Sequence, residues 1–415
     1  MKTKLLSLVC IALLSIFTSC SKDDDTFNNK GSRKSEGNFD ATFTKETVYF
    51  DSSETDKGVV SIDEERNIYK FRNTSEKAKQ LKKGDIVLIH GKAFGKANKV
   101  TNQGNEIIVE AIEATLDELI EDGTIEWATY CDFQPGTQFK AQMGDEIYEP
   151  SFRAGNDVKF DFNYGDCKYT IVMDMKKESA DVKLEVEKKI GSAVKGKFTA
   201  EGKISSFSSE NKIVYKKSKL TNFSNSNTNL QGELTLSITV AGSGNDAVNL
   251  NMPVILGAYP LMVGPIPTVI KLKIQIVINA VVPLDGSAQV SAKFKYDSQT
   301  GFSYDGVTPQ VKGKIGSYSI DKGITETGAS SAIAVNFGIG FPRIEVGIFN
   351  SVVVPWVQTA FLIGGDYTAF PACRQARAQF IGSCGIDFSF LGFKHSENKN
   401  IWSQEQVLFK TGDCK

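Results

Sequence analysis

Histidine, cysteine and carboxylate side chains carry most acid–base, nucleophilic and metal chemistry in proteins, and histidine is nearly absent from this chain. Its 415 residues include two histidines, His90 and His395. A centre that uses histidine as a base or metal ligand would have to include one of them, and a cysteine nucleophile would need one as its partner. We expect both histidines to be structural or exposed rather than catalytic.

No local motif supplies a catalytic centre. The chain contains no Gly-x-Ser-x-Gly elbow, no phosphate-binding loop, no His-Glu-x-x-His motif, no EF-hand loop and no Cys-x-x-Cys pair. The acidic residues between Glu106 and Glu118 are explained by strand faces and the start of a helix. We therefore expect no enzyme, no cofactor and no metal, although two distant carboxylates could still meet in the fold, as glycoside hydrolysis requires.

Aromatic rings offer a second route to function, because sugar-binding surfaces favour exposed tryptophan and tyrosine. The chain has 27 phenylalanines, 12 tyrosines and three tryptophans, which favours a packed core over a binding surface. Trp127 and Trp356 are expected in the core, the latter because it follows a valine run and Pro355. Trp402 follows the polar segment 396–400, so we expect it to reach solvent and name it as the candidate ligand-binding residue.

The N-terminal residues read as a targeting signal. Residues 1–4 carry two lysines, residues 5–17 are apolar, and Thr18 and Ser19 are small. An apolar run of this length is too short for a comfortable transmembrane helix, which needs about 20 residues. Residues 1–19 are therefore predicted to be a secretory signal peptide.

The end of this signal, Ile16-Phe17-Thr18-Ser19-Cys20, resembles the lipobox of bacterial lipoproteins. In that family the cysteine receives a diacylglyceryl group, the signal is removed before it, and the new amino terminus is acylated. Phe17 departs from the usual aliphatic residue but stays apolar. The resemblance implies lipidation of Cys20 and firm membrane attachment through two or three acyl chains such as palmitate, since one chain alone binds marginally.

Three aspartates at positions 23–25 follow the cysteine, and they are similar to the export tag of surface lipoproteins in Bacteroidetes-type Gram-negative bacteria. This resemblance implies attachment to the outer membrane facing outside, with its periplasmic face as the alternative. Residues 20–38 are predicted to be a flexible acidic tether. Loss of Lys2 and Lys4 with the signal, and of no acidic residue, changes the formal charge from −1 to −3. This balance argues against nucleic acid as a partner.

The five cysteines that follow Cys20 suit an oxidising compartment. Cys373 and Cys384 are close in sequence, at the ends of what reads as one hairpin, and form the first predicted disulfide. Cys131 with Cys167 is the second. Cys414 is then left over, although it could replace either partner of the first pair.

The body reads as strands. Apolar and polar residues alternate with period two along most of the chain, most regularly over residues 271–282, and no long apolar stripe of period 3.6 occurs. We predict a mainly β fold in which antiparallel meanders form β-sandwich or barrel-like domains. One short helix is predicted at residues 115–122, because Thr115 and Glu118 form a capping box and Gly123 can close the helix.

Three folded regions are expected. Residues 45–127 form a small β-rich domain, residues 128–225 an antiparallel meander, and residues 226–415 a C-terminal β domain that is either separate or one unit with the meander. With its Gly84-Asp85 pair, its valine-rich strand and the helix segment 114–120, the first region resembles a module of large secreted bacterial β-proteins. This resemblance implies an extracellular setting and no chemistry.

Residues 247–270 are the most apolar stretch after the signal, but four prolines and two glycines argue against a transmembrane helix. We expect a buried extended connection that leads into the strand at 272–282. The alternative is that this stretch lines an apolar groove.

These observations favour a lipid-anchored envelope protein that is displayed at the cell surface and binds or adheres without catalysis. A glycan or a protein would be its partner, besides the membrane itself. Two alternatives stay open: an extracellular polysaccharide hydrolase, and a carrier or assembly factor that holds a lipid-like ligand at the apolar region 247–278.

Overall fold

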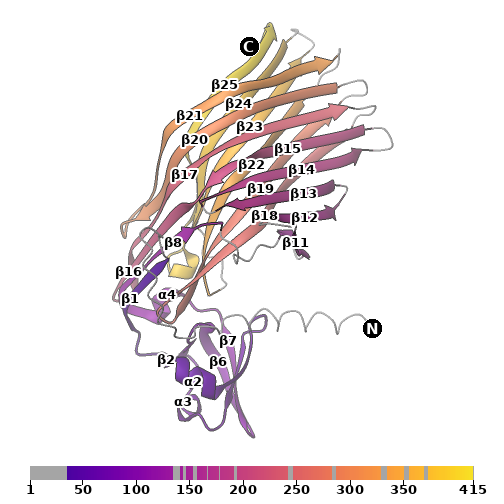
Figure 1. Ribbon diagram of the computed structural model, residues 1–415. Helices are drawn as coiled ribbons and strands as arrows, with labels where there is room; N and C mark the ends of the chain where they lie inside the picture. The colour runs from indigo at the N-terminus through magenta and orange to yellow at the C-terminus, as the bar shows by residue number, and fades with distance from the viewer. Residues whose placement is uncertain are drawn as a thin grey trace, which may run out of the picture. The chain divides into compact units, whose positions relative to one another are not determined.

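The computed structural model describes residues 35–133, 141–143, 146–152, 157–165, 167–176, 178–190, 194–241, 246–282, 287–328, 334–349, 355–368 and 373–414. These residues are mainly β-strand and form three sheets, as the alternation predicts (Figure 1). The predicted signal peptide, Cys20 and most of the tether lie outside the described residues. The end of the predicted tether, residues 36–38, belongs to a strand.

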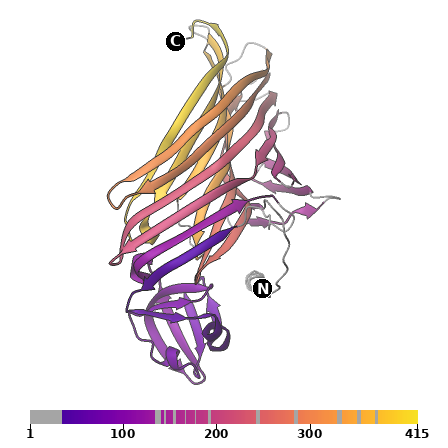
Figure 2. The same ribbon diagram turned by 60° about the vertical axis from the view of Figure 1, so that its left-hand side comes forward.

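The smallest sheet has six strands and lies within residues 47–112. Figure 2 shows it in indigo and violet. In spatial order the strands are β2 (Thr47–Phe50), β5 (Ile86–Ile89), β6 (Ala93–Gln103), β7 (Glu106–Ile112), β4 (Ile68–Arg72) and β3 (Val59–Asp63). Two short helices, α2 (Ser52–Gly58) and α3 (Glu76–Lys79), belong to the same region. Its own core includes the stacked rings of Phe50 and Phe71, whose centroids lie 4.6 Å apart.

The first large sheet has eleven strands. Its main path is β1 (Glu36–Phe43), β8 (Ile120–Cys131), β16 (Phe207–Lys216), β17 (Lys219–Ala241), β15 (Val194–Ser205), β14 (Ser179–Ile190), β13 (Cys167–Lys176), β12 (Asp157–Tyr164) and β11 (Ser151–Phe152). The path branches at β17, which also pairs with β20 (Ser287–Tyr304), and β20 pairs with β21 (Pro309–Gly328).

The second large sheet has eight strands. In order they are β10 (Glu146–Tyr148), β9 (Ala141–Met143), β18 (Asp246–Val263), β19 (Ile266–Val282), β22 (Ala334–Ile348), β23 (Pro355–Thr368), β24 (Cys373–Asp387) and β25 (Ser396–Gly412). A short 3-10 helix, η1 (Ser389–Leu391), connects the last two strands.

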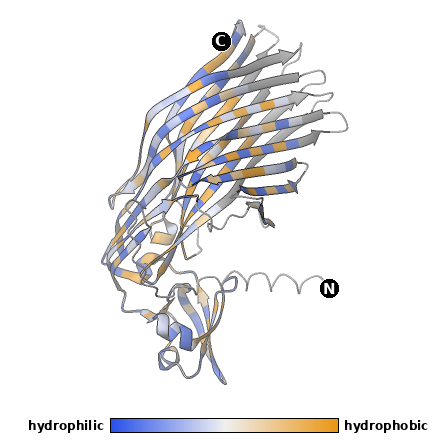
Figure 3. Ribbon diagram, in the orientation of Figure 1, coloured by the Kyte–Doolittle hydropathy of each residue, from blue (hydrophilic) through white to orange (hydrophobic). Residues whose placement is uncertain are grey.

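The two large sheets bury their apolar faces against each other. Phe198 of the first sheet contacts Phe337 of the second, and Phe294 contacts Phe361, each pair with ring centroids 5.2 Å apart. Figure 3 shows the alternation of apolar and polar residues along the long strands that makes this packing possible. One continuous core therefore fills the space between the sheets, as in a sandwich.

The strands cross the predicted domain boundaries. Residue 127 lies within β8 and residue 225 within β17, so neither position separates two folded regions. Residues 35–415 form one compact unit. The predicted boundaries are misplaced because alternation in the sequence does not show whether a strand ends at a given position or continues through it.

The predicted helix is real but shorter. Helix α4 spans Leu116–Leu119, and Glu118 Oε2 accepts the Thr115 N–H at 3.1 Å, as a capping box requires. From Ile120 the chain pairs with β1 instead. Gly123 does not close the helix: it lies in β8 at φ 138°, where a Cβ would be 2.3 Å from the Asp40 carbonyl oxygen.

The apolar stretch 247–270 is extended, as predicted, and forms most of the hairpin of β18 and β19. Gly264 makes the turn at φ 60°. Within the described residues, the other edge of β18 pairs only at Ile255, with Gln142. Proline is tolerated on a strand edge that lacks a partner, since its missing N–H then costs no ladder bond. This placement explains how Pro260 fits inside a strand.

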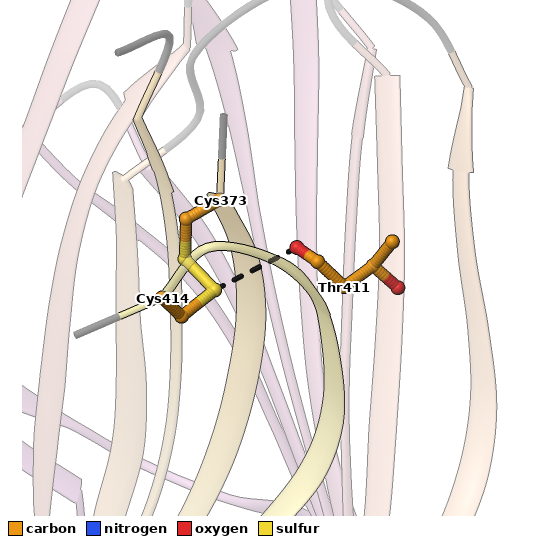
Figure 4. Close-up of a disulfide and its surroundings, with 3 residues drawn as sticks. All are labelled: Cys373, Thr411 and Cys414. Carbon is orange, nitrogen blue, oxygen red and sulfur yellow. Dashed lines mark hydrogen bonds between the residues drawn. A yellow bond between two sulfur atoms is a disulfide. The ribbon is translucent and has the colours of Figure 1, made fainter. Parts of the chain in front are cut away.

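The predicted disulfide between Cys373 and Cys384 is wrong, because both residues lie on the single strand β24. Eleven residues of extended chain span about 36 Å, far beyond the reach of a disulfide. The structure instead joins Cys373 to Cys414 across the β24–β25 pair, with Cα atoms 4.9 Å apart (Figure 4). Cys373 pairs in register with Gly412, two residues before Cys414.

The second predicted disulfide is also not formed. Cys131 lies on β8 and Cys167 on β13, five strand positions away in the same sheet. Neighbouring strands are about 4.8 Å apart, which places the two cysteines roughly 24 Å apart along the sheet. Both side chains are buried and contribute to the core.

The disulfide should restrain the C-terminal strand. In a chain that begins after Cys20, Cys414→Ser should lower the free energy of unfolding by about 2–4 kcal/mol, because it opens a covalent loop. Alkylation in denaturant without reductant should label Cys131, Cys167 and Cys384 in the parent chain, and Cys373 as well in the variant. The control Cys384→Ser should lose one label. A lower label count in Cys414→Ser, or a new label on a cysteine other than Cys373, would contradict the pairing.

Glu118 should make stability depend on pH. Burial opposes its ionisation, but hydrogen bonds from Lys96 (2.8 Å) and Thr115 outweigh burial and lower the pKa of the carboxyl below its ordinary 4.5. A lowered pKa adds stability that is present above the unfolded-state pKa and is lost as pH falls through the folded-state value. Because the pair is about one-third exposed, Glu118→Gln should cost no more than about 1 kcal/mol at pH 7.

Urea unfolding at pH 7 and pH 3 measures this effect. The difference between the parent chain and Glu118→Gln should shrink at pH 3, because the unfolded chain binds a proton at Glu118 there and the folded carboxyl resists it, so the stabilisation declines. Glu76→Gln is the matched control, because Glu76 pairs with Lys79 on an exposed helix surface and this pair contributes little to the free energy of unfolding. An equal difference at both pH values would contradict the assignment.

Candidate functional site

Two polar rows cross the face of the second large sheet that points away from the core. Strand register aligns one residue from each of five neighbouring strands in each row. The first row is Lys273, Arg343, Gln358, Ser383 and Asn400, and the second is Lys271, Glu345, Trp356, Gly385 and Asn398. The residues between them along the strands, such as Ile344 and Val357, are buried in the core. Period-two alternation therefore gathers polar side chains on this outer face.

Five of these side chains are in mutual contact, and we name them the outer-face cluster: Lys273, Arg343, Glu345, Trp356 and Gln358. At its centre, the Glu345 carboxylate is only 4% exposed. Lys273 Nζ lies 2.6 Å from Glu345 Oε2, and Arg343 Nε donates to Oε1 at 3.0 Å. An isolated buried carboxylate would be costly, and the two cations compensate for that burial.

Arg343 is also held from its two other sides. Its guanidinium carbon lies 4.1 Å from the centroid of the Trp356 ring, a cation–π contact. Its Nη1 donates to Gln358 Oε1 at 3.4 Å. A planar guanidinium that is stacked on a ring and bonded at two nitrogens has one fixed orientation, which a lysine could not reproduce.

Glycines on the neighbouring strands make room for these large side chains. A Cβ at Gly385 would lie 2.1 Å from Trp356 Nε1, and a Cβ at Gly340 would lie 2.2 Å from Gln358 Cδ. The register shift between Gly340 and Arg343 falls beside the cluster. The side chains are thus positioned by backbone features on rigid strands. The arrangement can donate hydrogen bonds to an oxygen-bearing ligand, and it also fixes the shifted register of β22.

The predicted binding residue Trp402 has a different setting. Its ring packs against Phe380, with centroids 4.5 Å apart, and covers Gly382. It is only partly exposed, and its buried indole N–H has no hydrogen-bond partner among the described residues. Trp356, which sequence reasoning placed in the core, is the tryptophan with charged and amide neighbours, while Trp127 is buried.

Both histidines are engaged with neighbours. His90 Nδ1 lies 2.7 Å from the Tyr49 hydroxyl, beside a hollow of about 580 Å³ that also includes Asp51. Burial, followed by the charges of Asp51 and Glu54, raises the pKa of Tyr49, so its hydroxyl stays protonated at neutral pH. Asp51 accepts the Glu54 N–H and caps α2. Tyr49, Asp51 and His90, three of the polar groups around this hollow, are therefore already hydrogen-bonded.

The second histidine and the cysteines form no catalytic pair among the described residues. His395 Nε2 lies 3.4 Å from Glu397 Oε2. Burial raises the pKa of the Cys384 thiol to about 11 and that of the Cys131 thiol well above its ordinary value. Because the thiolate is the nucleophile, such thiols are inert at neutral pH. In the same ranges, no three histidine, cysteine or acidic side chains gather as a metal site.

The inner face of β19, where an apolar ligand was considered, is filled by protein. Leu272, Ile274 and Ile276 have no exposed surface and belong to the continuous core. This face lies opposite the first large sheet and packs as the interior of a β-sandwich does. The observation weakens the carrier alternative at this position.

A polar row also crosses the inner face of the first large sheet. Asn225 Nδ2 donates to Asn211 Oδ1 at 2.8 Å, and Asn227 Nδ2 donates to Asn225 Oδ1 at 2.7 Å. Ser209 and Thr300 lie in register with Asn227, and all five side chains are at most 4% exposed. Such buried networks favour one strand register, because a shifted register would break these two amide hydrogen bonds.

Sequence reasoning missed the outer-face cluster. The usable signal was the alternation that places Arg343 with Glu345 and Trp356 with Gln358 on one face of adjacent strands. No local pattern gives the pairing of those strands with each other and with the strand of Lys273.

Comparison of the chain with known proteins found no relative. No protein-family model, no curated protein and no solved structure matches the chain. In the described part, no helix is long and apolar enough to cross a bilayer.

The glycine beside Trp356 can be tested directly. Gly385→Ala should lower the free energy of unfolding by about 1–3 kcal/mol, because a methyl group there overlaps the indole and forces it to move. Gly196→Ala is the matched strand control, since its Cβ would meet Phe198 no closer than 3.4 Å. Urea unfolding compares both with the parent chain. Equal effects of the two substitutions would refute the role assigned to Gly385.

Proposed function

We propose that this chain is a lipid-anchored cell-envelope protein that is displayed on the outside of the outer membrane and binds a glycan or protein partner without catalysing a reaction. The observation that carries the binding role is the outer-face cluster, a stacked and hydrogen-bonded arginine on rigid strands. The anchor rests on the N-terminal sequence alone.

The N-terminal residues support the anchor and its length. Cys20 follows an apolar run and two small residues, and the acidic cluster at 23–25 begins three residues after it. The first described strand begins at Glu36. Residues 21–35 would therefore connect the acylated cysteine to the folded part and hold it off the membrane.

The composition of the cluster supports a binding role. Arginine and tryptophan are the residue types most enriched where binding energy is concentrated, and precise sites sit on strands whose side chains are already held in place. The contacts of Arg343 with Glu345, Trp356 and Gln358 remove most of the side-chain freedom that a ligand would otherwise have to restrict. Hydroxyl or carboxylate oxygens are the groups such a guanidinium would bind.

The hydrolase alternative has less support. Among the described residues, the buried carboxylate of the cluster is already bound by two cations, which is the arrangement of a positioning group rather than of a general acid. No observation favours a reaction over binding.

The proposal is tested in cells that make the full chain. Protease treatment of intact cells should remove the folded part, and membrane fractionation should move the protein to the soluble fraction in Cys20→Ala. Pull-down from the same cells should recover a glycan or protein partner with the parent chain, and at least fivefold less of it with Arg343→Gln and Trp356→Phe. Arg66→Gln is the matched control, because Arg66 is an exposed arginine in the turn between β3 and β4.

Urea unfolding of each variant must first show that it is folded. Membrane association that persists in Cys20→Ala would overturn the anchor. Protection of the folded part from protease in intact cells would overturn surface display in favour of the periplasmic face. Equal partner recovery by the parent chain and both cluster variants would overturn the binding role of the cluster.

A further inference from the structure

We infer that a second site, on the six-stranded sheet, binds an acidic saccharide unit, a sugar that carries a sulfate, phosphate or carboxylate group. It is a hollow of about 410 Å³ between α3 and the strands β6 and β7, which we name the lysine hollow. Its polar lining is four lysines and two asparagines: Lys79, Lys82, Lys83, Lys99, Asn98 and Asn102. The inference concerns a different sheet from the outer-face cluster and would stand if that cluster bound nothing.

The charge of the hollow is positive, although the whole chain is nearly neutral. Lys79 pairs with Glu76 and Lys99 with Glu110, each at 2.7 Å and with largely exposed side chains. Exposed pairs of this kind are weak and leave their lysines free to bind another anion. Lys82 and Lys83 have no carboxylate partner within the described residues. Two of the four lysines around the hollow therefore have no salt-bridge partner among the described residues.

The backbone holds the two unpaired lysines at the hollow. The Lys82 N–H donates to Asp85 Oδ2 at 2.9 Å, which uses that buried carboxylate within the turn. Gly84 adopts φ 99°, a left-handed conformation that favours glycine, and its N–H donates to the Ala97 carbonyl at 2.8 Å. The turn is tied to β6, so the lysines lie in a fixed backbone position rather than on a free loop.

The residue types indicate the class of ligand. A lysine ammonium group attracts an anion as a point charge, whereas the planar guanidinium of arginine also selects for the geometry of the anion. The lining contains lysines and no arginine. The site should therefore accept sulfate, phosphate or carboxylate groups with little distinction. The asparagine amides can bond to hydroxyl groups, and the partly exposed Val100 supplies apolar surface for a sugar ring. A hollow of this volume lies in the range of small-molecule sites, about 300–1,000 Å³.

Calorimetric titration of the purified full chain tests this inference with three probes: a heparin-derived sulfated hexasaccharide, neutral maltohexaose and inorganic sulfate. The sulfated hexasaccharide should bind at least tenfold more tightly than either other probe, and less tightly as the salt concentration rises. The double variant Lys82→Gln with Lys83→Gln should weaken its binding at least tenfold.

The double variant Lys216→Gln with Lys217→Gln is the matched control, because it removes the same charge from an exposed adjacent lysine pair where β16 ends and the turn to β17 begins. It should change the dissociation constant less than twofold. Both double variants should unfold at the parent urea concentration, since surface exchanges of this kind rarely affect stability. Equal weakening by both variants would show attraction by net charge and overturn the site. Equal binding of maltohexaose would overturn the acidic ligand, and equal binding of inorganic sulfate would overturn the saccharide.

Discussion

The pairing of strand β17 along both of its edges is the constraint on which the first large sheet depends. One edge meets β20 over nearly its whole length, and the other meets first β16 and then β15. The change of partner coincides with a register shift between Asn227 and Leu230. A Cβ at Gly202 would lie 2.0 Å from the Glu233 carbonyl oxygen, so the backbones there approach more closely than a side chain allows. This strand joins the meander and the C-terminal region into one folded unit.

Because the two large sheets pack face to face, the two sides of each sheet have different roles. The inner faces pack against each other through aromatic contacts such as that of Phe294 with Phe361. The buried asparagine row adds a polar network within that core. The outer faces are free to carry charge: on the first large sheet, Lys197 of β15 pairs with Glu185 of β14, and Lys183 of β14 pairs with Glu201 of β15. The two sites that we propose, the outer-face cluster and the lysine hollow, both use side chains that lie outside the core between the large sheets.

The two sites differ in how they hold their cations. In the outer-face cluster, Arg343 is stacked, hydrogen-bonded and only 18% exposed, so its orientation is set before a ligand arrives. In the lysine hollow, flexible lysine side chains lie beside apolar lining residues and supply positive charge without a preferred binding geometry. The first arrangement suits selective recognition of one group, and the second suits a ligand with many similar anionic groups.

The sequence by itself determined the local features: the mainly β fold, the extended path of the apolar stretch, and the capping box of α4. These depend on alternation with period two and on contacts within three or four residues, both of which can be read in order along the chain. The tertiary structure alone decided that Cys373 meets Cys414, that β17 has three partners, and that Arg343 stacks on Trp356. Each of these depends on which distant strands pair and in which register, and alternating strands resemble one another too closely for the pattern to specify their partners.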